Sequence, residues 1–243
     1  MNFPSALVAA KLIKRYKRFL ADVEMISGQR LTVYCPNTGS MMNCAEPGSR
    51  VWLSQSDNAK RKYGYTWELV ETEPNILTCI HSGLANKIVK EGIEGGLVAE
   101  VAGFDGLQSE VCYGKEGSRV DFLLSNQALK CYLEVKCVTL HAGEGWGLFP
   151  DSVSTRASRH LRELASVIDK NTRALLLFFV QNNAIQRVAP AAQLDPVYSQ
   201  TLQEVMACGV EVIAYQADVS TERIVLGQPL PFFTKADVET KKL

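Results

Sequence analysis

The segment that decides the fold reads CYLEVKCV, from Cys131 to Val138, and it follows a second apolar segment, VDFLL, which runs from Val120 to Leu124. Both are rich in strand-forming residues. Successive side chains of a strand point to opposite faces, so Glu134 and Lys136 share one face of the later strand. If the two strands are neighbours, Asp121 joins them, and two carboxylates and an ammonium group meet at one spot.

This polar set has the composition of a phosphate-directed metal site. Mg²⁺ or Mn²⁺ takes oxygen ligands and is commonly held by one or two carboxylates together with substrate phosphate. Asp121 and Glu134 supply those carboxylates, and Lys136 would orient or deprotonate an attacking water. An acid–x–lysine pair alone is more often a solvated pair at a sheet edge, so the interpretation depends on Asp121. Further ligands are expected from Glu110, and from Glu91 or Glu94.

A polar stripe follows on the next predicted helix. Its members are spaced at i, i+3, i+4 and i+7, and they are Arg156, Arg159, His160 and Glu163. The arginines and His160 are expected to steady a phosphate, because the planar guanidinium donates two parallel hydrogen bonds. The alternative is an ordinary solvated helix face.

The element order from residue 82 predicts an α/β domain with a mixed sheet. Ser82 is expected to cap a helix from Leu84 to Glu94, which Gly95 and Gly96 end. Strands follow at 107–113, 119–125 and 131–140, then a helix at 156–169 and a buried strand at 174–180. Asp195 and Pro196 open a last helix, which Gly209 ends before a strand at 210–215.

The first 80 residues predict a small β-barrel of the oligonucleotide-binding (OB) type. Short apolar segments at 19–23, 31–34, 51–53 and 65–70 alternate with turn-forming residues. We therefore expect an OB-like barrel over residues 1–81, the α/β domain over 82–234 and a polar tail over 235–243.

Charge and cysteine usage limit the partners and the location. The 243 residues have a formal net charge of zero, so no overall basic field predicts nucleic acid. The basic residues of the barrel nevertheless form two compact clusters, with candidate DNA contacts at Arg15, Lys17, Arg18, Lys60, Arg61 and Lys62. Tyr16, Tyr63 or Trp67 would stack on bases. Seven cysteines without a CxxC pair suit a reducing cytoplasm, and neither a signal peptide nor a membrane span is expected.

The order and spacing resemble the PD-(D/E)xK nuclease superfamily, with Asp121 and Glu134-Val135-Lys136 at the motif positions and Val120 in place of the proline. A closer resemblance is to the bacterial sugar fermentation stimulation protein A (SfsA) family. It rests on five separated blocks, which are CPNTGSM from Cys35, KRKY with YTWEL from Lys60, GSRVDFLL from Gly117, EVKCVTL from Glu134, and FPD with TR and HLREL from Phe149. Ala59 and Cys137 depart from the expected pattern, away from the proposed metal ligands.

This resemblance implies an OB-type barrel joined to a nuclease-like domain, with DNA binding of low sequence specificity, and RNA as a further possible partner. A regulatory role in maltose use has been proposed for the family, although no sugar-site signature is visible in the residues. Two interpretations stay open, a Mg²⁺- or Mn²⁺-dependent nuclease and a non-catalytic DNA-binding regulator that retains the scaffold. A small-molecule-responsive transcription factor is disfavoured, because the sequence has no helix-turn-helix pair with a basic recognition helix.

Overall fold

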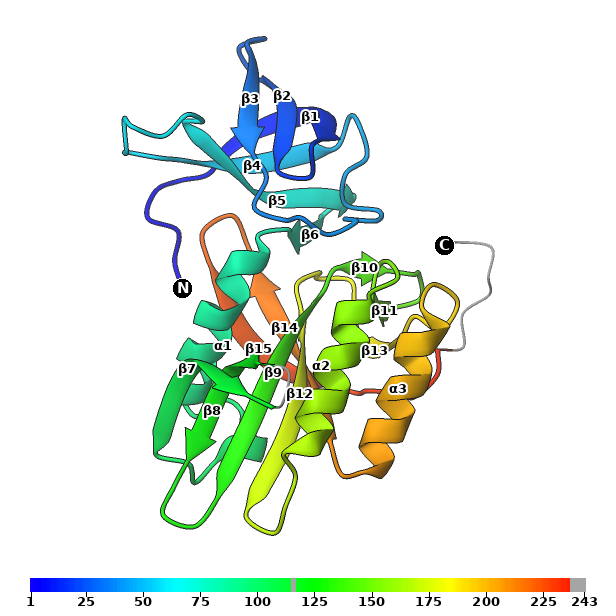
Figure 1. Cartoon of the computed structure of the whole chain (residues 1–243). Coiled ribbons are helices and arrows are strands. Elements are labelled where there is room, and N and C mark those ends of the chain that lie inside the picture. The colour runs from blue at the N-terminus through cyan, green and yellow to red at the C-terminus, as the bar shows by residue number, and fades with distance from the viewer. Residues whose placement is uncertain (115–116, 237–243) are drawn as a thin grey trace.

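A computed structural model describes residues 1–114 and 117–236 of the chain. The N-terminal part is a small β-barrel, and the C-terminal part is a six-stranded mixed sheet with helices on both faces (Figure 1). This architecture confirms the predicted fold class. The barrel strands end at Cys79 and the first helical turn begins at Ser82. Part of the predicted tail, residues 237–243, lies outside the described residues.

The barrel is one sheet in the order β3-β2-β1-β4-β5-β6, which closes where Tyr34 of β3 pairs with Thr66 of β5. Its strands are β1 (Val8–Tyr16), β2 (Leu20–Met25), β3 (Arg30–Tyr34), β4 (Arg50–Gln55), β5 (Tyr65–Glu73) and β6 (Ile76–Cys79). The sequence did not predict β1, because lysine and arginine interrupt its apolar pattern. That strand still buries Ala10 and Leu12 and leaves Lys11 exposed between them.

The C-terminal sheet has the order β15-β14-β12-β9-β8-β7. Its strands are β7 (Gly106–Tyr113), β8 (Ser118–Ser125), β9 (Lys130–Val138), β12 (Thr172–Val180), β14 (Glu211–Val219) and β15 (Ile224–Leu230). The central β12 pairs in parallel with β9 and β14, and it is buried from Ala174 to Val180. Such a strand is covered on both faces, as its uninterrupted apolar sequence predicted.

A small second sheet lies beside the first. It consists of β10 (Leu140–His141), β11 (Trp146–Phe149) and β13 (Arg187–Pro190). Sequence reasoning predicted neither this sheet nor the edge strand β15. These strands are short, or contain glycine and proline, which weaken a strand pattern.

In the described part of the chain, three α-helices cover the sheet, α1 (Ala85–Glu94) on one face, and α2 (Thr155–Ser166) with α3 (Pro196–Ala207) on the other (Figure 1). The turns η1 (Ser82–Leu84) and η2 (Ala99–Val101) flank α1. Asp195 caps α3 as predicted, since its side chain accepts the Tyr198 amide. Among the described residues, no helix is both long and apolar enough to cross a bilayer.

Two predicted helix boundaries are wrong. The Ser82 side chain does not cap α1, because its Oγ donates to the Pro36 carbonyl of the barrel at 3.1 Å. Helix α2 ends at Ser166 rather than at Asp169, which forms an isolated bridge with Thr172.

The packing of α1 against β15 gives a test of the fold. A Cβ at Gly92 would overlap the Leu226 side chain, with the Leu226 Cβ only 2.9 Å away. We expect Gly92→Ala to lower the free energy of unfolding by about 1–3 kcal/mol, although alanine favours a helix. Urea unfolding followed by circular dichroism measures the change. Gly64→Ala is the control, since no atom lies within 4 Å of the new methyl group. Equal stability of the two variants would contradict the close packing.

Candidate active site

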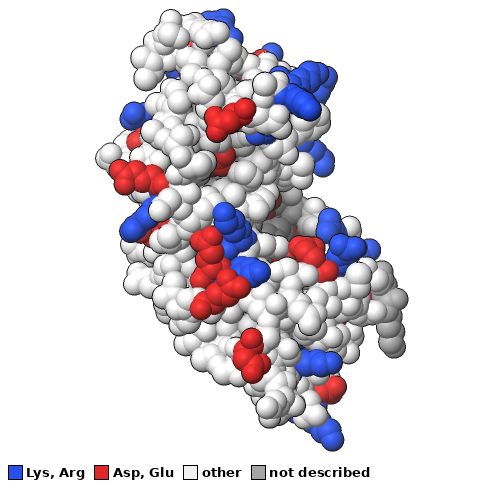
Figure 2. All heavy atoms as spheres, turned by 90° about the vertical axis from the view of Figure 1, so that its left-hand side faces the viewer, with Lys and Arg blue, Asp and Glu red and all other residues white. Residues whose placement is uncertain are grey.

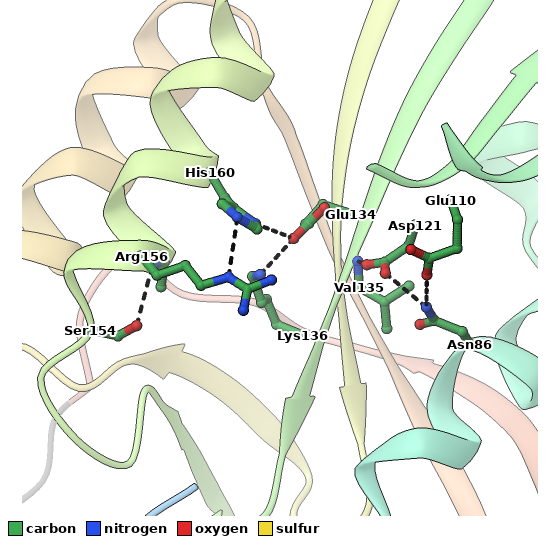
Figure 3. A network of polar contacts seen from close by, with 10 residues as sticks. Asn86, Glu110, Asp121, Glu134, Val135, Lys136, Ser154, Arg156 and His160 are labelled. Carbon is green, nitrogen blue, oxygen red and sulfur yellow. Dashed lines mark hydrogen bonds and ion pairs between the residues drawn. The ribbon is translucent and has the colours of Figure 1, made fainter. Parts of the chain in front are cut away.

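The polar site begins where β8 and β9 separate. Their ladder runs from Ser125 and Lys130 to Phe122 and Leu133 and stops there. At the next position, the Asp121 side chain takes the place of a ladder partner, because its Oδ2 accepts the Val135 amide at 2.7 Å (Figure 3). Its Oδ1 accepts from the Asn86 side chain of α1, also at 2.7 Å. Asp121 therefore lies in the gap between two strands and is fixed from both sides.

Glu134 faces α2 from the other side of the gap. Its side chain is buried, and Oε1 accepts from the Lys136 ammonium at 2.6 Å and from His160 Nδ1 at 2.9 Å (Figure 3). Its Oε2 is buried without a hydrogen-bond partner among the described residues. A buried carboxylate oxygen that lacks a partner is costly, so this atom is suited to a ligand or cation.

The two carboxylates have opposite pKa shifts. Burial and the nearby charge of Glu134 raise the pKa of Asp121, although the Val135 and Asn86 hydrogen bonds work against that rise. Burial also acts to raise the pKa of Glu134, but the hydrogen bond from His160 and the charge of Lys136 outweigh it and lower that pKa. Glu134 is thus kept ionised by its partners, and its charge acts on Asp121. The predicted meeting of Asp121, Glu134 and Lys136 is what the structure shows.

His160 is held between two charged groups. Its Nδ1 lies against Glu134, and its Nε2 accepts from Arg156 Nε at 3.4 Å. An accepting Nε2 places the ring proton on Nδ1, so that His160 donates to Glu134. Sequence reasoning expected His160 to contact phosphate. In the structure His160 lines the cleft, and both of its ring nitrogens contact side chains, those of Glu134 and Arg156.

The cleft around these groups has a volume of about 700 Å³. It is bordered by the beginnings of two helical segments, at Ser82 to Asn86 and at Ser154 to Ala157. Its basic lining residues are Arg119, Lys136, Arg156 and Arg159. The predicted arginines therefore do lie at the cleft, and Arg119 is an addition that the sequence did not suggest.

Of the three glutamates expected as further metal ligands, one lies at the cleft and two form ion pairs elsewhere. Glu110 lies at the cleft, at a position of β7 that the β7–β8 ladder leaves unpaired. It has a left-handed φ of 57°, and the Asn86 side chain donates to it at 3.4 Å. Glu91 instead pairs with the N-terminal amine at 2.8 Å, and Glu94 with Lys90. Within the described residues, no three His, Cys, Asp or Glu side chains converge as a complete ligand set.

The basic clusters of the barrel lie at one end. The Lys17–Arg18 turn joins β1 to β2, and Leu20 just beyond it pairs with Tyr34, whose ring lies 5.8 Å from the Arg61 guanidinium. Lys17, Arg18, Lys60, Arg61 and Lys62 are exposed.

Two residues proposed for DNA contact lie elsewhere than expected. The guanidinium of Arg15 donates to four main-chain carbonyls, so it organises the barrel rather than facing solvent. Trp67 is fully buried, and its indole N–H donates to the Leu69 carbonyl, so it cannot stack on a base.

Sequence reasoning did not identify Asn86 or Tyr113 near the site, and it did not predict that Glu163 is buried. Burial, together with the charges of Glu134 and Glu163, raises the pKa of Tyr113. The i+7 spacing indicated that Glu163 shares a helix face with Arg156. It did not indicate that the Glu163 side chain is buried.

The chain matches two family models and resembles proteins of several bacteria along nearly its whole length. A model described as the sugar fermentation stimulation protein RE domain matches residues 83–223, and one described as the SfsA N-terminal OB domain matches residues 13–80. Sugar fermentation stimulation protein homologs of Shewanella sp. (strain MR-4) and Thioalkalivibrio sulfidiphilus (strain HL-EbGR7) are each 50% identical, over 232 and 230 residues. These alignments cover 95% of this chain and 99% and 97% of those proteins.

A solved structure has the same fold. It is that of Pyrococcus furiosus SfsA in complex with Ca²⁺, with a TM-score of 0.84 and 24% sequence identity. The match covers 96% of this chain and 98% of that one.

The partners of Glu134 predict a pH-dependent effect of His160→Ala. Removing a donor to a buried carboxylate should lower the free energy of unfolding by about 1–3 kcal/mol at pH 7. The pKa of Glu134 is lowered in the folded chain, so its carboxylate stabilises the fold above the unfolded pKa of about 4.3. That contribution is lost as pH falls through the folded pKa. Urea unfolding of wild type and variant should therefore converge in acid. Arg162→Ala, at an exposed position of the same helix, should show no such trend, and a pH-independent loss in His160→Ala would contradict the assignment.

Proposed function

The chain belongs to the sugar fermentation stimulation protein family, and we propose that it is a DNA-binding protein of low sequence specificity that hydrolyses phosphodiester bonds with Mg²⁺ or Mn²⁺. RNA is an alternative strand for the same site. The observation that supports this most directly is the pair of carboxylates at the opening between β8 and β9, half-buried Asp121 and buried Glu134.

The donor set fits a hard divalent cation. The raised pKa of Asp121 and the unpartnered Oε2 of Glu134 are both relieved when a positive charge lies between the carboxylates. Mg²⁺ and Mn²⁺ accept few protein ligands and complete their shell with water and phosphate. The P. furiosus protein was solved in complex with Ca²⁺, which is likewise an oxygen-seeking cation. Asp121 and Glu134 would hold the metal, with Glu110 as a further candidate at the rim.

The remaining cleft residues have distinct parts in the proposed reaction. A metal bound here would polarise the scissile phosphate and acidify a water. Lys136 reaches into the cleft beside Glu134, where its ammonium can donate to the attacking water or to a phosphate oxygen. His160 keeps Glu134 ionised and oriented, as ligand-supporting groups do at metal sites.

The cleft is also suited to the phosphates of a strand. The N-terminal residues of α1 and α2 border it, and a helix N-terminus favours an anion through its free amides and dipole. Arg119, Arg156 and Arg159 add positive side chains at the lining. Acidic and basic residues are interspersed over the face that Figure 2 shows, so attraction to DNA would come from local groups such as these and the barrel clusters.

Metal binding and cleavage test the proposal together. Mn²⁺ at about 100 times its dissociation constant should stabilise the wild type by about 2.7 kcal/mol, and Asp121→Asn and Glu134→Gln should lose that shift in thermal unfolding.

Cleavage of labelled single- and double-stranded DNA and of RNA should require Mg²⁺ or Mn²⁺ and stop in EDTA. Lys136→Ala should cut about 10²–10³-fold more slowly, whereas Lys130→Ala, at an exposed position of the same strand, should not. Equal cleavage by the wild type and all three site variants would exclude this site, and DNA binding without cleavage in any metal would favour the non-catalytic regulator.

The exposed basic loop before β5 gives a separate test of binding. If Lys60 and Lys62 each neutralise a phosphate of duplex DNA, Lys60→Ala/Lys62→Ala should reduce the slope of log K against log salt by about 1.8. Fluorescence anisotropy over a salt series in EDTA measures it. Lys87→Ala/Lys170→Ala removes two exposed lysines of the C-terminal part and should leave the slope unchanged. The same slope in both double variants would place the DNA elsewhere on the surface.

A further inference from the structure

The loop between β3 and β4 belongs to the barrel and lies next to the cleft, where it contacts residues 82 and 151 of the C-terminal part. Ser82 at the start of η1 donates to the Pro36 carbonyl, and Met41 donates its amide to Asp151 Oδ2 at 2.9 Å. A second hollow of about 170 Å³ is lined by Asn37 and Gly39 of this loop. It shares the wall residues Ser82, Cys137 and Phe149 with the active-site cleft. The loop is therefore continuous with the rim of the cleft, although it belongs to the barrel.

One side chain fixes the shape of this loop. The Arg15 guanidinium donates to the carbonyls of Asn37 at 2.9 Å, Gly39 at 2.8 Å and Ser40 at 3.1 Å. It also donates to the Arg18 carbonyl at 2.8 Å. The loop carbonyls are thus directed toward Arg15 and away from an approaching anion.

The opposite side of the loop carries donors. Thr38, Gly39 and Ser40 are exposed. The main-chain amides of Thr38 and Ser40 donate to no protein group within residues 1–114 and 117–236. Both residues also carry exposed hydroxyl groups. Backbone amides and hydroxyls of this kind are common contacts to nucleic-acid phosphates.

Positive charge lies next to these donors. Lys17 and Arg18 are exposed, and both have left-handed φ angles, 51° and 64°, that side chains other than glycine rarely adopt. The Arg18 carbonyl is held by the same guanidinium as the loop, so the two cations stay beside it. Asp151 lines the hollow behind the loop, which directs an anion to the exposed side.

We propose that residues 37–40, held by Arg15 and flanked by Lys17 and Arg18, form a second phosphate-binding subsite, which receives the backbone of the strand where it leaves the active-site cleft. The subsite rests on the proposed function, because the ligand is a phosphodiester of the same nucleic acid. It assigns the barrel a specific task, to position the strand relative to the carboxylates. Arg15 is a positioning residue in this scheme, since it holds the loop without touching the strand.

A negative charge at Ser40 tests the subsite. We expect Ser40→Glu to weaken binding of a short fluorescein-labelled DNA strand about tenfold or more, since it replaces a donor with a group that repels phosphate. Anisotropy titration in EDTA measures binding without cleavage. Ser27→Glu introduces the same charge at another exposed serine of the barrel and should bind like wild type. An abasic strand of equal length should show the same loss with Ser40→Glu, because the contact is to phosphate and not to a base.

The outcomes separate the subsite from the function. If wild type binds the strand and the two glutamate variants bind equally well, the subsite is wrong and the proposed function stands. A loss that disappears with the abasic strand would also overturn it, in favour of a base contact. If wild type binds neither strand, the proposed function fails and the subsite fails with it. Arg15→Lys keeps the charge but not the four-carbonyl contact, so it should weaken binding in the same direction in a protein whose circular dichroism spectrum is unchanged.

Discussion

The hydrogen bond from the Val135 amide to Asp121 is the contact on which the site depends. It ends the β8–β9 ladder and supplies the partner that the Val135 amide would otherwise lose. The strands can then separate without leaving this buried donor unpaired. The same contact holds the Asp121 carboxylate in the opening, close enough to Glu134 for the charge of one to affect the other. One hydrogen bond therefore ends the ladder and also holds Asp121 where the charge of Glu134 raises its pKa.

Much of this arrangement could be predicted from the sequence, because it follows from local rules. Strand alternation places Glu134 and Lys136 on one face, and the short connection from Leu124 makes the two strands antiparallel neighbours. Asn86 could not be predicted in the same way, since its contact with Asp121 depends on how α1 lies over the sheet. The role of His160 depends on the rotation of α2, which directs the ring at Glu134 and not at solvent.

The positions of lysine and arginine in the sequence were the least reliable basis for predicting which side chains are free to bind DNA. Arg15 belongs to a cluster of basic residues in the sequence. Lys17 and Arg18 of that cluster are exposed, whereas the Arg15 guanidinium donates hydrogen bonds to four main-chain carbonyls. A count of lysine and arginine cannot distinguish these cases, because main-chain carbonyls and water both accept hydrogen bonds from such side chains. Charge also misled the prediction of β1. Its lysines face solvent and interrupt the apolar pattern, although the strand buries its other face.

The two family models divide the chain between residues 80 and 83, but the packing does not. Trp52 and Leu69 of the barrel lie in the same apolar cluster as Ala85 and Ile88 of α1. Cutting the chain at that line would expose both halves of one hydrophobic core. Either part produced alone would therefore present an apolar surface to water, and such surfaces promote aggregation.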